Sequence, residues 1–88
     1  MTFSYTTSGG VCAVKIIVET DEDHIIQEVV FQGGCPGNHL GIAALVKGMA
    51  PRDVIARLNG IRCGSRSSSC PDQLAKALDA YCREYNIG

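Results

Sequence analysis

Residues 11–32, VCAVKIIVETDEDHIIQEVVFQ, decide the fold. Apolar and polar residues alternate from Val11 to Glu19, which is typical of a half-buried strand. Asp21-Glu22-Asp23 forms an acidic turn, and a second strand is expected from His24 to Gln32. So short a connection predicts an antiparallel hairpin. The residues expected on its buried face are Cys12, Val14, Ile16, Val18, Ile25, Val29 and Phe31.

The register of this hairpin bears on two of the cysteines. Even-numbered residues of the first strand must pair with odd-numbered residues of the second if both apolar sets are to share one face. Cys12 is then expected opposite Phe31 or Gly33, and Cys35 follows shortly after. The hairpin therefore places both cysteines at its open end. Residues Thr2 to Gly10 are expected to form a short edge strand or an arm.

The pattern changes from strand to helix after Gly33. A first helix is expected after Asn38 as its N-cap, a second from Pro51 to a stop at Asn59-Gly60, and a third from Pro71. Strands followed by helices indicate a two-layer α+β domain. We expect an antiparallel hairpin or a small three-stranded sheet, with three helices packed on one face. At 88 residues the chain is a single domain, residues 1–88.

Composition excludes several classes of function. The net charge of −1 gives no electrostatic footprint for nucleic acid. No apolar run approaches the roughly 20 residues that span a bilayer, so a membrane protein is not expected. The first ten residues show no export signal, which predicts a cytoplasmic protein whose thiols are kept reduced.

Five cysteines are many for such a chain, and an odd number argues against a complete disulfide framework. Four of them lie at expected element ends beside glycine or proline: Cys12, Cys35, Cys63 and Cys70. Four thiolates suit a tetrahedral zinc site, which we favour over an iron–sulfur cluster. Without a CxxC pair, spacing alone leaves ordinary small core residues as an equal alternative. Cys82 lies in the middle of the third helix and is expected to be a buried apolar residue.

Other residues support other kinds of site. Cys70 is expected at the N-cap of the last helix, where the helix dipole favours a thiolate, so Cys63 and Cys70 could act as a redox pair. Backbone at Gly33 to Asn38, with Arg62 or Arg66, could bind a nucleotide or another anion. His39 could replace a cysteine as ligand, although a surface or capping histidine is commoner. The Asp21–His24 turn is expected to be solvated.

Ser68-Ser69-Cys70-Pro71-Asp72 resembles the motif that names the TSCPD domain family, with serine at its first position. Segments around Cys12, Cys35 and residues 60–64 are also similar to small members of that family. The resemblance implies metal binding by the cysteines and an association with cobalamin-dependent ribonucleotide reductases.

Ribonucleotide reductase, or another protein, is therefore an expected partner. Catalysis by this chain alone is not expected, because 88 residues cannot build the barrel that a reductase needs. No cobalamin or nucleotide motif is present. Short strands with an exposed edge also favour a homodimer.

Overall fold

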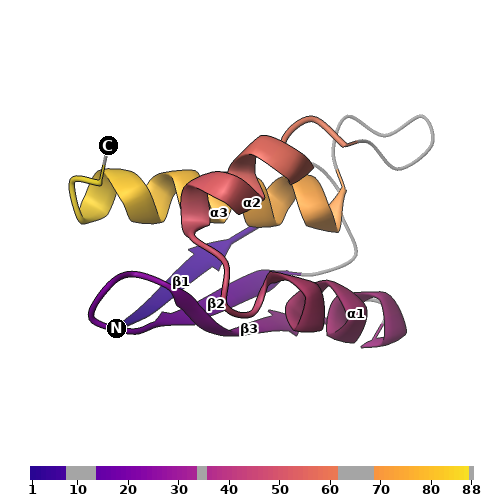
Figure 1. Ribbon diagram of the computed structural model, residues 1–88. Helices are drawn as coiled ribbons and strands as arrows, with labels where there is room; N and C mark the ends of the chain where they lie inside the picture. Colours follow the sequence, from indigo (N-terminus) through magenta and orange to yellow (C-terminus); the bar gives the residue numbers. More distant parts are fainter. Residues whose placement is uncertain (8–13, 34–35, 62–68, 88) are drawn as a thin grey trace.

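The computed structural model describes residues 1–7, 14–33, 36–61 and 69–87 (Figure 1). It has strands β1 (Thr2–Thr6), β2 (Lys15–Thr20) and β3 (Ile26–Gln32), followed by helices α1 (Pro36–Val46), α2 (Pro51–Leu58) and α3 (Cys70–Glu84). This is the α+β order that the sequence predicts, with the three-stranded form of the sheet.

The strands form one antiparallel sheet in the order β1-β2-β3. Even-numbered residues of β2 pair with odd-numbered residues of β3, as expected, but Phe31 pairs with Ile16. Its predicted pairing with Cys12 is therefore wrong. A shift in register between Glu19 and Thr20 reverses the alternation at the start of β3. For that reason Ile26 is fully buried, and the predicted Ile25 is only half-buried.

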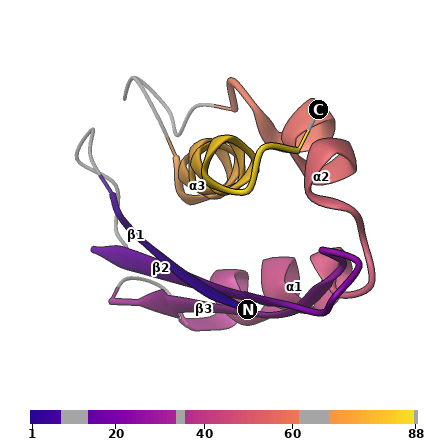
Figure 2. The same cartoon turned by 90° about the vertical axis from the view of Figure 1, so that its left-hand side faces the viewer.

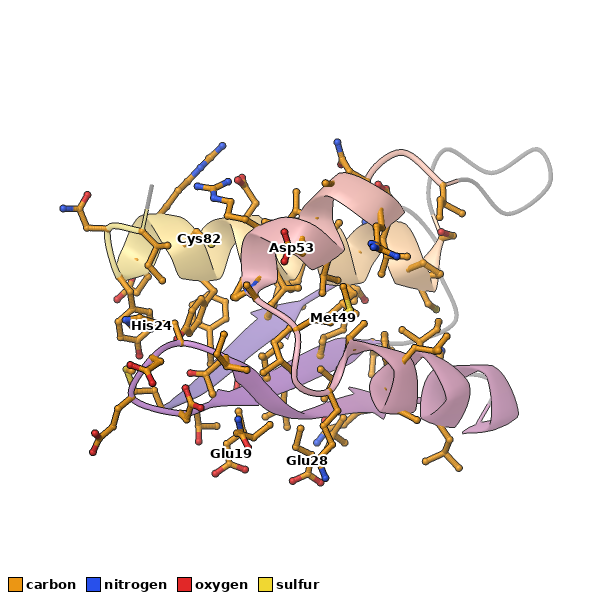
Figure 3. The ribbon with its side chains drawn as sticks, viewed as in Figure 1. Glu19, His24, Glu28, Met49, Asp53 and Cys82 are labelled. Carbon is orange, nitrogen blue, oxygen red and sulfur yellow. The ribbon has the colours of Figure 1, made fainter. Side chains whose placement is uncertain are left out.

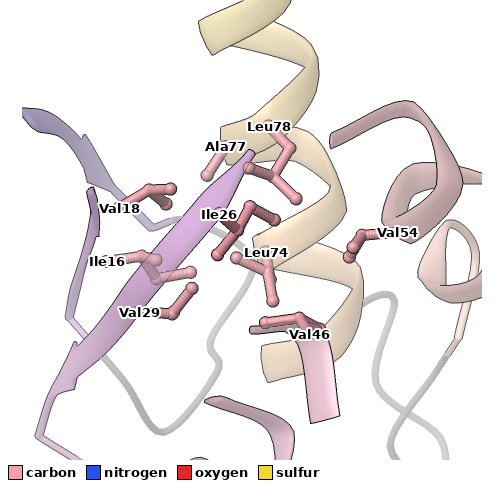
Figure 4. Close-up of a cluster of buried hydrophobic side chains, with 9 residues drawn as sticks. All are labelled: Ile16, Val18, Ile26, Val29, Val46, Val54, Leu74, Ala77 and Leu78. Carbon is pink, nitrogen blue, oxygen red and sulfur yellow. The ribbon is translucent and has the colours of Figure 1, made fainter. Parts of the chain in front are cut away.

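Helices α2 and α3 lie over one face of the sheet and close the core against it (Figure 2). α3 packs against α2 and crosses above the strands, while α1 lies beside β3. Each helix contributes to a single apolar cluster over the buried face of β2 and β3 (Figure 4). Its buried members are Ile16, Val18, Ile26, Val29, Val46, Val54, Leu74, Ala77 and Leu78. Val14 was predicted to join this face but is 63% exposed.

The helix boundaries differ in detail from the prediction. α1 begins at Pro36, so Asn38 lies inside its first turn and is not its N-cap. α2 begins at Pro51 as predicted, because proline supplies the φ of a first helical residue and needs no donor there. Gly60 has a φ of 87°, a left-handed conformation that ends the helical run without strain.

No described helix covers the opposite face of the sheet (Figure 2). Polar residues dominate it, and its central row runs Ser4, Ile17 and Val30 across the three strands. Val30 is 41% exposed. The outermost described strand on the α1 side is β3, whose outer edge pairs with no described strand.

Candidate metal centre and the polar networks beside it

Several element ends meet at one end of the molecule. Thr6 pairs with Lys15, and Lys15 with Gln32, so the end of β1, the start of β2 and the end of β3 are adjacent. The start of α1, the end of α2 and the start of α3 lie at this same end (Figure 1). Chain segments that carry the four predicted ligands join the described residues here.

Ser69 and Asp72 fix the approach of α2 to α3. The Ser69 hydroxyl donates to the carbonyl oxygen of Ile61 at 2.6 Å and accepts from the backbone N–H of Asp72 at 3.2 Å. One Asp72 carboxylate oxygen accepts from the N–H of Gly60 at 2.7 Å, and the other binds Lys76. Both motif residues are buried. They therefore hold the backbone at 60–61 against the first turn of α3.

Cys70 is the first residue of α3, and Ser69 is the N-cap. The prediction that Cys70 is the cap was wrong by one residue, because the serine hydroxyl is the better acceptor for orphan N–H groups of the first turn. Cys70 is a free thiol with intermediate exposure, still at the positive end of the helix. This position is accessible enough for the sulfur to bind a cation or take part in thiol exchange.

The other three predicted ligands, Cys12, Cys35 and Cys63, lie outside the described residues, as do Arg62 and Arg66. The four-cysteine site is therefore still a prediction. Within residues 1–7, 14–33, 36–61 and 69–87, no three His, Cys, Asp or Glu side chains form a group that could hold a metal ion.

Cys82 lies far from Cys70 on the same helix. Its position is twelve residues after Cys70 on α3, about 18 Å along the axis. It is fully buried, and this desolvation raises the pKa of its thiol. The prediction that Cys82 is an apolar core residue is confirmed (Figure 3).

His39 is buried against the sheet on the inner side of α1. Its ring stacks on Phe31 with centroids 4.4 Å apart and planes 17° from parallel. Burial lowers the pKa of the imidazole because the charged form is poorly solvated there. The structure therefore shows a buried, stacked ring and not a surface or capping histidine.

We expect this burial to make the domain less stable in acid. The unfolded chain takes up a proton on His39 near pH 6.5, whereas the folded state resists it, so stability should fall as the pH drops below 6.5. His39→Phe keeps an aromatic ring against Phe31 and should remove this part of the dependence of stability on pH. The test is to measure the free energy of unfolding of both proteins with urea between pH 7 and pH 5. If this free energy falls equally with pH in the two proteins, the expectation is contradicted.

A second buried network lies at the far end of α3, around the turn between β2 and β3. The Tyr81 hydroxyl is 2.7 Å from the Thr20 hydroxyl and 2.6 Å from Nδ1 of His24. The His24 ring also contacts Tyr81 and Tyr85 edge-on or tilted. His24 has a φ of 64°, a conformation that only glycine adopts freely.

The turn was predicted to be solvated, and this holds only for its tip. Glu22 and Asp23 are exposed, but the Asp21 carboxylate accepts from the N–H groups of Asp23 and Ile25 at 2.9 Å. No periodicity in the sequence predicts that His24 meets Tyr81. The available signal was a histidine in a tight turn together with a tyrosine on the inner face of the last helix.

These features define a small two-layer α+β domain whose cysteine motif starts the last helix. The model of the TSCPD domain matches residues 1–82. The chain therefore belongs to the TSCPD domain family. In the other two comparisons, no curated protein and no solved structure matches the chain.

None of the described helices is both long enough and apolar enough to cross a membrane.

Proposed function

We propose that this protein is a small metal-binding module in which Cys12, Cys35, Cys63 and Cys70 hold one zinc ion. The observation that carries the proposal is the convergence of described element ends around Cys70. Val14 donates its N–H to the carbonyl oxygen of Gln32 at 2.8 Å, which joins the two hairpin strands at this end. The Ile61–Ser69 hydrogen bond joins α2 to α3 there.

Covalent geometry limits how far each predicted ligand can lie from this framework. One residue spans at most about 3.6 Å of extended chain, so two residues span about 7 Å. Cys12 precedes Val14 by two positions, Cys35 follows Gly33 by two, and Cys63 follows Ile61 by two. Each thiol is therefore tethered closely to a fixed point at the same end of the molecule.

Zinc binding would also compensate for the small hydrophobic core of this domain. An 88-residue chain buries a smaller share of its surface than a larger domain, and its apolar core leaves a thin margin of stability. Binding by four thiolates adds folding free energy directly. A site at the meeting point of the sheet and all three helices would join both layers.

The test is elemental analysis of reduced protein, with a matched pair of variants. We expect about one zinc per chain in the wild type, loss of the metal in Cys70→Ala, and full retention in Cys82→Ala. Both variants remove one thiol from α3, but only Cys70 lies at the proposed site. Wild-type protein without zinc, or equal zinc in the two variants, would refute the proposal.

A thiol redox function is the second candidate, with Cys63 and Cys70 as the pair. The hydrogen bond from Ser69 to Ile61 supports it, because it tethers the two cysteine-bearing segments to each other. A mild oxidant should then remove two free thiols per chain and lower the intact mass by two hydrogens. An unchanged thiol count in metal-free protein would eliminate this candidate.

We further propose that the module is an accessory of ribonucleotide reduction, because of the association that the family resemblance implies. Its role would be structural or thiol-based, since the chain is too small for the reductase reaction itself. Adding the purified protein to a cobalamin-dependent reductase should raise turnover, and Cys70→Ala should not. Equal turnover with and without the protein would count against this role.

A further inference from the structure

The outer edge of β3 offers backbone hydrogen-bonding groups along part of its length. At its first residue this edge is occupied, because Ile26 donates its N–H to Met49 at 3.0 Å and accepts from Gly48 at 2.8 Å. Beyond that point no described strand pairs with β3. An open edge of this kind is a template for another strand.

The neighbouring ladder determines which residues face outward. Thr7 donates to Val14 and Thr20 donates to Met1, so even-numbered residues of β2 turn their backbone groups toward β1. Because these groups alternate along a strand, odd-numbered residues of β2 bond with β3. Their partners are Glu28, Val30 and Gln32. Val29 and Phe31 therefore direct their N–H and C=O groups toward the open edge.

The pattern around Val30 fits a second copy of the same strand. If two β3 strands run antiparallel about a twofold axis at Val30, each Val29 lies opposite Phe31 of the partner subunit. Both residues then exchange their outward N–H···O=C bonds reciprocally. Val30 meets Val30 of the partner subunit on the helix-free face, beside Ile17 in the same row.

Charges on the helix-free face favour this arrangement. Glu19 pairs directly with Glu28 within the chain, and both side chains point away from the helices (Figure 3). Two like charges in such a pair repel. In the antiparallel register, Glu28 lies opposite Gln32 of the partner subunit, and Lys15 of the partner subunit follows in the same row. The row across the junction therefore brings a cation to within two strands of Glu28.

Apolar surface beside the edge also remains uncovered. A groove of about 340 Å³ runs between β3 and α1, lined by Val29, Val30, Phe31 and Leu40 among others. Leu40 is 71% exposed on a helix whose residues from 40 to 46 are all apolar or glycine. A helix with this composition is normally covered on all sides.

We propose that two copies of this chain associate through their β3 edges, paired antiparallel about Val30. The joined strands form one continuous sheet, and the grooves beside α1 face each other across the junction. The dimer proposal uses backbone groups of β3 and no cysteine, so its test does not depend on the zinc proposal.

A matched pair of substitutions tests the dimer. Val30→Lys places two lysines opposite each other at the twofold axis, and Ser4→Lys adds the same charge in the same row at the other edge of the sheet. Sedimentation equilibrium under reducing conditions should give twice the 9.4 kDa of one chain for the wild type. We expect Val30→Lys to raise the dissociation constant at least about tenfold, and Ser4→Lys to leave it nearly unchanged.

Hydrogen exchange gives a second, independent readout on the wild type. In the dimer the amides of Val29 and Phe31 should be protected at high protein concentration and lose protection on dilution. A monomer at all concentrations overturns the proposal, and so does a dimer that Ser4→Lys dissociates in place of Val30→Lys. Unprotected Val29 and Phe31 amides in a dimer would also overturn it. Circular dichroism of each variant confirms that it is folded.

Discussion

Asp72→Ala should lower the free energy of unfolding by about 2–4 kcal/mol, measured by urea denaturation at pH 7. The carboxylate is 1% exposed and forms a charge-assisted bond to the N–H of Gly60, which alone contributes roughly 1.5–3 kcal/mol. It also places a negative charge in the first turn of α3, worth roughly 0.3–1 kcal/mol. The loss is large for a domain of this length.

The control for this prediction is Asp79→Ala on the same helix. Asp79 pairs with Arg52 and Arg83, but these ion pairs are partly exposed and should contribute less than about 1 kcal/mol. Asp72→Asn separates the two parts of the effect, since an amide oxygen can still accept from Gly60 without the charge. Equal losses in Asp72→Ala and Asp79→Ala would show that Asp72 does not hold α2 to α3.

Tyr81→Phe should cost about 2 kcal/mol at pH 7, the second large effect that we expect. The ring remains in the core, but the hydroxyl that joins Thr20 to His24 is lost. A buried polar group left without its partner typically costs roughly 1–3 kcal/mol. Tyr85→Phe, at a residue that is 36% exposed, is the control and should change stability by less than about 0.5 kcal/mol.

Tyr81→Phe should also change how stability depends on pH in alkaline solution. Burial raises the pKa of Tyr81 above its ordinary value of 10.0, so the folded state keeps the phenol protonated. The unfolded chain releases this proton near pH 10, and wild-type stability should therefore fall as the pH rises above 10. The difference in the free energy of unfolding between wild type and Tyr81→Phe should become smaller above pH 10. A difference that stays constant from pH 8 to pH 11 would show that Tyr81 does not titrate with unfolding.

The general architecture could be predicted because local patterns and tertiary packing agree. Alternating residues in β2, proline at the start of α2 and Gly60 at its end all act within a few positions. The predicted register is wrong at Ile25 and Ile26 because a β-bulge reverses the alternation of buried and exposed residues there. Both residues are apolar, so either could be the buried one. No pattern of hydrophobicity can distinguish such neighbours.

The site was predictable to a smaller extent. The motif located the start of α3, and the prediction that Cys82 is a buried apolar residue is confirmed. Which of Ser69 and Cys70 caps the helix depends on hydrogen-bond geometry at one residue. The roles of Asp72 and His24 depend on contacts with residues far along the chain, Gly60 and Tyr81, which sequence spacing does not encode.

The left-handed backbone at His24 has a consequence for how this turn can change during evolution. Glycine would relieve the strain there, yet it would remove the imidazole that meets Tyr81. Asparagine tolerates the same φ, but its shorter side chain does not reproduce the aromatic contacts. Replacement of His24 is therefore coupled to Tyr81, and among homologues the two positions should vary together.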